Sequence, residues 1–199
     1  MLDFKHKSCN LDISNFCTLK CPKCMRVRWN DPKDIPGGHM TVDQFKKIVS
    51  YFRYIHFCGQ VSDPIFNPHF IEFLTICKEM NKRGTIHTAA SQRPYSWYER
   101  AFDANSHMKW RFSVDGLPNE SNQYRINQDG EYLFEVMKMG ASKGLHVDWQ
   151  YIVFRYNEDH IQEAHMISKE HGINFIVNYS GRWKNEEDPY KPRNPEFSA

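Results

Sequence analysis

Long apolar segments, a strong net charge and histidine-based motifs are all missing from this 199-residue sequence. No stretch approaches the ~20 apolar residues that cross a bilayer, and residues 1–16 contain no apolar run, so we expect neither a membrane span nor a signal peptide. A formal net charge of +2 is too small to indicate nucleic acid or an anionic membrane as a partner. The ten histidines form no HExxH or His–carboxylate pattern. We therefore expect a cytoplasmic globular protein.

A cysteine spacing suited to disulfides is also lacking. The chain has six cysteines, but they are unevenly distributed. Cys17, Cys21 and Cys24 crowd into eight residues, whereas Cys58 and Cys77 lie in apolar runs typical of buried small side chains. In a reducing compartment, clustered cysteines indicate metal or redox chemistry more often than disulfides.

Short apolar or β-branched segments alternate with helical patterns along the chain. The predicted strands are Asn10–Ser14, Tyr54–Cys58, Thr85–Ala89, Lys109–Val114, Val147–Phe154 and Asn174–Asn178. Their starts lie roughly 30 residues apart on average, which is the length of a βαβ unit. This alternation predicts an α/β protein with a parallel sheet. Because a closed eight-unit barrel needs ~250 residues, we predict an open partial (β/α)6 barrel with six parallel strands.

We expect this barrel to be one domain, residues 1–179. The tail, residues 180–199, is rich in proline and charge. It either covers the opening of the barrel or is disordered.

The expected helices carry start and stop signals. Thr41, followed three residues later by Gln44, predicts a capping box. Asn67 and Pro68 predict the N-cap and first position of a second helix that ends before Gly84. Similar start and stop signals indicate a helix within residues 157–172 and, less clearly, another within residues 129–144.

The loop after the first predicted strand reads C-x3-C-x2-C, from Cys17 through Cys21 to Cys24. Ligands of parallel α/β sheets bind at the carboxyl ends of the strands, where this loop should lie. Structural zinc usually takes four ligands as two cysteine pairs, and no second pair is present. A cubane iron–sulfur cluster also takes four ligands, so three thiolates would leave one iron open. Zinc and three free cysteines remain the alternatives.

The C-x3-C-x2-C loop resembles the signature of the radical S-adenosylmethionine (radical SAM) superfamily. The sequence of this loop, "CTLKCPKC", is most similar to the branch of peptide- and protein-modifying maturases. The likeness extends from about Leu11 to Asn178. It implies that the three cysteines bind three irons of a [4Fe–4S] cluster and that the amino and carboxylate groups of SAM chelate the fourth.

After their second strand these enzymes carry a Gly-Gly-Glu-Pro-like turn that holds the amino group of SAM. The counterpart here is "CGQVSDPIFNP", in which Asp63 and Pro64 take the acid–proline position and Gln60 precedes them. Val61 and Ser62 replace the glycines, and aspartate replaces glutamate. The alternative interpretation is a plain Asx-type turn.

The fourth predicted strand ends in "FSVDG". The resemblance implies that Ser113 and Asp115 contact SAM and that Arg125, twelve residues after Ser113, pairs with its carboxylate, because a planar guanidinium can bind both oxygens. It also implies that Val153 supplies an apolar wall for the adenine.

Four weaker candidates accompany them. Thr88 or Ser91 could face the nucleoside, Gln150 could contact substrate, and His87 could point into the barrel.

The resemblance implies reductive cleavage of SAM and abstraction of a hydrogen atom from a peptide, protein or small-molecule substrate, with an external electron donor such as flavodoxin or ferredoxin. No cysteine follows Cys77, so we expect one cluster and no C-terminal extension for auxiliary clusters. The alternatives are a radical SAM activase, a nucleoside- or nucleotide-modifying enzyme, and a metal-binding interaction module with a degenerate SAM site. The sequence identifies no further catalytic residue.

Overall fold

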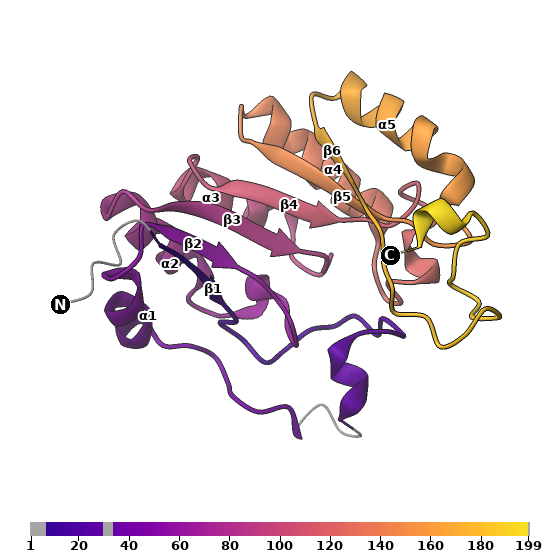
Figure 1. Cartoon of the computed structure of the whole chain (residues 1–199). Coiled ribbons are helices and arrows are strands. Elements are labelled where there is room, and N and C mark those ends of the chain that lie inside the picture. The colour runs from indigo at the N-terminus through magenta and orange to yellow at the C-terminus, as the bar shows by residue number, and fades with distance from the viewer. Residues whose placement is uncertain (1–6, 30–33, 199) are drawn as a thin grey trace.

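The computed structural model describes residues 7–29 and 34–198 and forms one six-stranded sheet in which neighbouring strands are parallel. In chain order across the sheet, the strands are β1 (Ser8–Leu11), β2 (Tyr54–Phe57), β3 (Arg83–Thr88), β4 (Lys109–Ser113), β5 (Val147–Ile152) and β6 (Asn174–Asn178) (Figure 1). The predicted α/β class and the six parallel strands of an open sheet are confirmed. Residues 1–6, 30–33 and 199, which belong to the expected domain and tail, lie outside the described residues.

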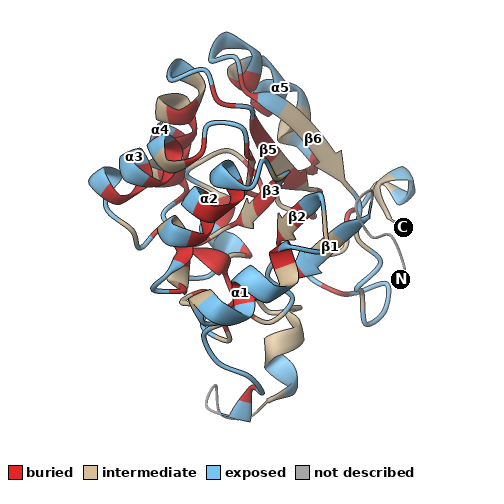
Figure 2. Cartoon of the chain, turned by 90° about the vertical axis from the view of Figure 1, so that its left-hand side faces the viewer, coloured by how far each residue is buried: buried red, intermediate tan, exposed pale blue. Residues whose placement is uncertain are grey.

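Helices connect the strands and cover one face of the sheet (Figures 1 and 2). They are α1 (Val42–Val49), α2 (Phe70–Glu79), α3 (Tyr95–Ala104), α4 (Gly130–Ser142) and α5 (Ile161–Glu170). On β4, Trp110 and Phe112 are completely buried, and the Trp110 ring packs against aromatic rings of α2 and α3. Arg111, between them, is half-buried on the other face. Among the described residues, no helix is long and apolar enough to cross a membrane.

The helix starts follow local hydrogen bonds. Thr41 and Gln44 form the predicted capping box of α1. Asn67 is not the N-cap residue of α2 as predicted, although its Oδ1 accepts from the His69 amide (2.8 Å) in the turn before the helix. Its Nδ2 donates to the carbonyl oxygens of Ile13 (2.6 Å) and Met40 (3.0 Å). The helix instead begins at Phe70.

The expected role of Gly84 at the end of α2 is also wrong. Gly84 lies inside β3, where a Cβ atom would come within 1.6 Å of the carbonyl oxygen of Ile55 on β2. Asn81, with φ of 51°, takes the left-handed position after the helix. Gly84 is therefore needed for the close approach of two strands.

Residues 180–198 pack against the molecule beside β5 and β6. The Tyr190 ring contacts Tyr124 and Phe154, at centroid distances of 5.3 and 6.1 Å. Farther along the tail, Arg193 forms an ion pair with Glu158 at the start of η5 (Glu158–His160). The tail thereby reaches the end of the sheet at which the strands finish (Figure 1).

Candidate functional site

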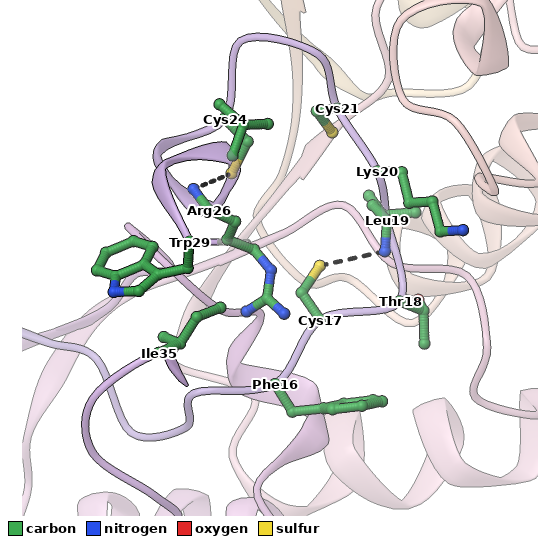
Figure 3. A pocket seen from close by; sticks show the side chains of 11 residues that line it. Phe16, Cys17, Thr18, Leu19, Lys20, Cys21, Cys24, Arg26, Trp29 and Ile35 are labelled. Carbon is green, nitrogen blue, oxygen red and sulfur yellow. Dashed lines mark hydrogen bonds between the residues drawn. The ribbon is translucent and has the colours of Figure 1, made fainter. Parts of the chain in front are cut away.

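The three-cysteine loop runs from the end of β1 to the short helix η1 (Met25–Arg28). Its conformation is fixed locally: the Cys17 sulfur accepts from the Leu19 amide (3.4 Å) and the Cys24 sulfur from the Arg26 amide (3.5 Å). Figure 3 shows the sulfur atoms of Cys17, Cys21 and Cys24 pointing towards the space that the loop encircles. The loop thus presents three thiols to one region at the carboxyl edge of the sheet.

The three thiols are not arranged around a single metal ion. Among the described residues, no group of three histidine, cysteine, aspartate or glutamate side chains is arranged to hold one metal ion. In a four-iron cluster each cysteine ligand binds a different iron, so the sulfur ligands surround a larger object than a single ion. Burial and the Asp63 carboxylate raise the pKa of Cys17 to about 12, and burial raises that of Cys21 to about 11. The thiols must therefore release protons when they bind metal.

Two cavities, of about 120 and 380 Å³, lie beside the loop. Both are lined by Cys21, Cys24, Gly59, His87, Ser113 and Arg125. The smaller cavity also contacts Cys17 and Asp63, and the larger contacts Gln60, Gln150 and Ile152. Most of the predicted site residues therefore meet at the end of the sheet that the topology predicts.

Asp63 lies at this site, but its carboxylate is already fully engaged. The carboxylate accepts hydrogen bonds from Thr88 Oγ1 (2.9 and 3.0 Å) and from the amides of Ile65, Ala89 and Ala90 (3.3, 2.8 and 3.0 Å). Burial raises the pKa of Asp63, and these donors oppose the rise. The side chain therefore ties the turn after β2 to the end of β3, and Thr88 contributes to this tie.

The turn before Asp63 depends on Gly59. A Cβ atom at Gly59 would lie 1.9 Å from the carbonyl oxygen of Ser62, so only glycine permits this turn. Asp12 fixes the turn from β1, since its carboxylate accepts from the Gln60 amide (3.0 Å) and from Ser62 Oγ (2.7 Å). Pro64 is buried in η3 (Pro64–Phe66) and lines neither cavity.

Arg125 lies in the segment after β4, lines both cavities and forms an ion pair with Asp115. Its Nε atom lies 2.7 Å from Oδ2 of Asp115, and both side chains are almost completely buried. Burial lowers the pKa of Arg125, but the Asp115 carboxylate raises it further, so the guanidinium stays charged. Asp115 lines neither cavity and contacts Arg125 from behind the lining.

Ser113 and β5 complete the wall. Gln150 donates to the Ser113 hydroxyl (3.3 Å) and lines the larger cavity beside it. Val153, like Pro64 and Asp115, is a predicted contact that the structure does not bring to either cavity, and its side chain is fully buried in the core. Its neighbour Ile152 lines the cavity instead, since successive residues at this point face opposite sides.

Sequence reasoning missed several lining residues. Arg26 donates through one guanidinium nitrogen to the carbonyl oxygens of Asn15 (2.8 Å) and Val61, joining the cysteine loop to the turn after β2. Arg182 extends from the tail to the larger cavity. Its contacts are long-range, and no local pattern could have revealed them. Arg26, by contrast, lies two residues after Cys24, which is a signal that could have been followed.

The described lining of the two cavities contains one carboxylate, that of Asp63, and it is occupied by internal donors. Of the weaker candidates, His87 lines both cavities, Thr88 lines the smaller and Gln150 the larger, whereas Ser91 lines neither. Burial, together with the charges of Arg111 and His56, lowers the pKa of His87 to about 4. The described lining therefore contains no evident pair of residues for acid–base catalysis. It does contain thiols that can bind a metal and a guanidinium that can bind the carboxylate of a ligand.

Comparisons with known proteins bear on the fold. No protein-family model matches the chain, and no curated protein matches it in sequence. Among solved structures, SuiB of Streptococcus suis bound to S-adenosylmethionine matches with a TM-score of 0.74 and 16% identity, over 96% of this chain and 44% of SuiB. SuiB bound to its precursor peptide SuiA matches with a TM-score of 0.74 and 15% identity, over 96% of this chain and 43% of SuiB. The chain thus spans less than half of the length of SuiB.

Two other structures match over most of this chain. The protein anSMEcpe with bound AdoMet matches with a TM-score of 0.66 and 15% identity, over 92% of this chain and 54% of that one. The radical S-adenosylmethionine methyltransferase TsrM from Kitasatospora setae, with cobalamin and a [4Fe–4S] cluster bound, matches with a TM-score of 0.57 and 10% identity, over 86% and 36%. The described chain therefore has the fold of the radical SAM core, an open α/β barrel of six parallel strands.

Proposed function

We propose that this protein is a radical SAM enzyme that holds one [4Fe–4S] cluster through Cys17, Cys21 and Cys24 and acts on a peptide or protein. The observation that carries the proposal is the convergence of three thiols from one loop on cavities that also present Ser113 and Arg125. Three thiolates would leave one iron of a cubane cluster without a protein ligand. The likeness of the whole fold to the radical SAM core supports the same conclusion.

A bound cluster would supply the electron for reductive cleavage of SAM and, through it, for abstraction of a hydrogen atom from the substrate. The chain's own residues bind and orient. Arg125, fixed by Asp115, pairs with the carboxylate of SAM through a planar group that can contact both oxygens. The Ser113 hydroxyl, steadied by Gln150, binds the ribose or the carboxylate.

The amino group of SAM is bound by the turn from Gly59 to Ser62, which includes Gln60. The Asp63 carboxylate does not bind it, because that carboxylate already accepts hydrogen bonds from Thr88, Ala89 and Ala90. In this proposal Asp63 and Pro64 act by holding that turn in shape. Ile152 takes the role that the sequence assigned to Val153 and forms the apolar wall for the adenine. Closing these groups around SAM excludes water from the reacting atoms.

A peptide or protein substrate is supported by the face of the sheet that the helices leave open (Figures 1 and 2). It is also supported by the match to SuiB bound to a precursor peptide. The electron would come from an external donor such as flavodoxin or ferredoxin.

A metal-binding module without SAM chemistry is the second candidate function. The observation that favours it is the engaged carboxylate of Asp63, which leaves no free acid for the SAM amino group in the described part of the site.

Anaerobic reconstitution with iron and sulfide tests both candidates. The radical SAM proposal expects about four irons per chain and release of 5′-deoxyadenosine from SAM under a low-potential reductant. In Cys17→Ala, Cys21→Ala and Cys24→Ala, both signals should be lost, whereas Cys77→Ala, a buried core cysteine, should keep them. A cluster without SAM cleavage would favour the second candidate. A single zinc ion per chain would exclude the cluster. Deuterium transfer from labelled peptides into 5′-deoxyadenosine would then identify the substrate.

A further inference from the structure

The face of the sheet that the helices leave open is polar (Figures 1 and 2). Parallel sheets are normally covered on both faces, and their strands are then apolar throughout. Here polar and apolar residues alternate instead. On β4, Trp110 and Phe112 are buried on the side of the helices, whereas Lys109 and Arg111 between them are only partly buried. We call the uncovered side the open face; its composition suits a polar ligand better than a further layer of protein.

The open face has more positive than negative charge. The six strands contain three basic residues, Arg83, Lys109 and Arg111, and one acidic residue, Asp148. Because side chains alternate along a strand, all four occupy positions of the open face. Arg83 and Lys109 form no ion pair with any residue that the structure describes. The face therefore has positive charge to offer to an anion.

Asp148 cannot neutralise this charge, because several groups share its carboxylate. Its Oδ2 atom accepts from Nε (3.1 Å) and a terminal nitrogen (2.9 Å) of Arg111. Its Oδ1 atom contacts Nε2 of His146 (3.0 Å) and accepts from Asn174 (2.9 Å). The side chain of Asp148 is fully buried, whereas that of Arg111 is 25% exposed. Since a guanidinium has five N–H groups, Arg111 is held in place by Asp148 and still has donors for a ligand.

These charges lie next to the cavities of the candidate site. His87 lines both cavities and is the register partner of Arg111 on the neighbouring strand. On β4, Ser113 also lines both cavities and follows Arg111 by two residues, a distance of about 7 Å along a strand. Gln150, which lines the larger cavity, follows Asp148 at the same spacing. A peptide that extends from the larger cavity onto the open face therefore meets Arg111 within a few residues of its own length.

We infer that the substrate presents a carboxylate to the open face and that Arg111 and Lys109 bind it. This inference rests on the proposed function, since it gives the chemical class of the substrate of the same site. The carboxylate belongs to an acidic side chain or to the carboxyl terminus of a peptide, close to the residue that reacts. Arg111 binds it through the donors that Asp148 leaves free, and Lys109 adds a second charge. Asp148 is a positioning residue, because it holds the guanidinium without contacting the substrate.

Peptide binding to the reconstituted protein tests this inference without turnover. Three short radiolabelled N-acetyl peptides of alanine and glycine are compared by anaerobic equilibrium dialysis, with SAM present and reductant absent. The first has a central glutamate and the second a central glutamine, both with an amidated carboxyl terminus; the third has the glutamine and a free carboxyl terminus. Wild-type protein should bind the first or the third peptide roughly tenfold or more tightly than the second, and which of the two it prefers identifies the source of the carboxylate.

Two variants and a matched control locate the preference. Arg111→Gln with Asp148→Asn should abolish it, and because this double variant removes one charge of each sign, the net charge of the protein stays the same. Lys109→Gln, which leaves the hydrogen bonds of Asp148 intact, should lower the preference by roughly threefold or more. Lys46→Gln removes the same charge from an exposed position of α1 and should leave the preference unchanged.

Equal affinities of the three peptides for wild-type protein would overturn the inference. So would a preference that survives in both the double variant and Lys109→Gln. If the double variant does not fold, the comparison of Lys109→Gln with Lys46→Gln decides, and an equal preference in these two would overturn the inference. Failure of the proposed function gives a different result: the preference for a carboxylate would persist, while reduced wild-type protein would release no 5′-deoxyadenosine from SAM.

Discussion

Arg125 and Asp115 show that the role of a residue depends on the side chain with which it pairs. The sequence placed both at the cofactor, but only Arg125 reaches the cavities, and Asp115 lies buried at 2.7 Å from it. Twelve residues separate Ser113 from Arg125, and that spacing could be read from the sequence. Their ion pair could not, because it depends on how the segment after β4 folds back.

Replacing Arg125 by alanine should weaken SAM binding while iron content stays near four per chain. A lost charge-assisted contact of about 1.5–3 kcal/mol corresponds to a roughly 10- to 150-fold rise in the dissociation constant for SAM. Equilibrium dialysis with labelled SAM measures the constant, and Lys143→Ala, at an exposed ion pair, serves as the control. Loss of iron along with SAM binding would show that Arg125 holds the loop rather than the ligand.

Asp115→Asn should destabilise the metal-free fold by about 3 kcal/mol, because it leaves the buried guanidinium of Arg125 without its counter-charge. Urea unfolding followed by tryptophan fluorescence gives the change in the free energy of unfolding. A change below ~1 kcal/mol would mean that water or another group already compensates Arg125.

His87 makes the stability of the metal-free chain depend on pH. Its pKa is lowered to about 4 in the folded state, whereas an unperturbed histidine titrates near 6.5. Between these values the unfolded chain binds a proton that the folded chain does not, so stability falls as the pH drops from about 6.5 to about 4.

The variant His87→Gln should remove that part of the loss. Urea unfolding at pH 7 and pH 5 measures it: the fall in the free energy of unfolding should be smaller in the variant than in the wild type. An equal fall in both proteins would mean that His87 is protonated in the folded state as readily as in the unfolded one.

At the scale of elements, the turn after β2 explains both a success and a failure of sequence reasoning. Motif order predicted this turn at the site, and the structure brings Gly59, Gln60 and Asp63 to the cavities. The pattern also suggested that Val61 and Ser62 had replaced the needed glycines, whereas Gly59 supplies the close approach two residues earlier. Face assignment at the end of β5 failed in a similar way. A one-residue shift exchanges Val153 for Ile152, and no local signal fixes where the strand ends.

Gly59→Ala should disturb this turn, because its Cβ atom would lie 1.9 Å from the Ser62 carbonyl oxygen and the backbone must move. We expect a loss of roughly 1–3 kcal/mol in the free energy of unfolding and weaker SAM binding. Gly38→Ala, where nothing lies within 4 Å of the added Cβ atom, is the control and should change neither. Equal behaviour of the two variants in both measurements would show that the turn tolerates a side chain.

At the scale of the whole molecule, spacing of the strands was enough to predict six parallel strands and an open sheet. The reason is physical: each βαβ unit is local, so its length and patterning are visible in the chain. The path of the tail was not predictable, because it depends on single long-range contacts. Asp188 is the main one, since its carboxylate accepts from the Lys23 ammonium and from the amides of Lys184 and Tyr190 (3.0 and 3.1 Å). This joins the tail to the residue before Cys24, and we propose that the tail covers this end of the barrel.

Asp188→Ala should release the tail. Hydrogen bonds to a charged group contribute about 1.5–3 kcal/mol, so the population of the detached tail, and with it the rate of proteolysis between residues 180 and 198, should rise at least tenfold. Glu186→Ala, whose carboxylate is exposed, is the control and should leave the rate nearly unchanged. Equal cleavage rates for Asp188→Ala and wild type would show that the aromatic contacts of Tyr190 suffice to hold the tail.

The central claim is that the three cysteines leave one iron free to bind SAM. Electron paramagnetic resonance of the anaerobically reconstituted and reduced protein, recorded with and without SAM, tests it most directly. The account predicts the spectrum of a reduced [4Fe–4S] cluster that changes on addition of SAM, and a smaller change at the same SAM concentration in Arg125→Ala. A cluster spectrum that SAM leaves unaltered, at a concentration that saturates related enzymes, would contradict it.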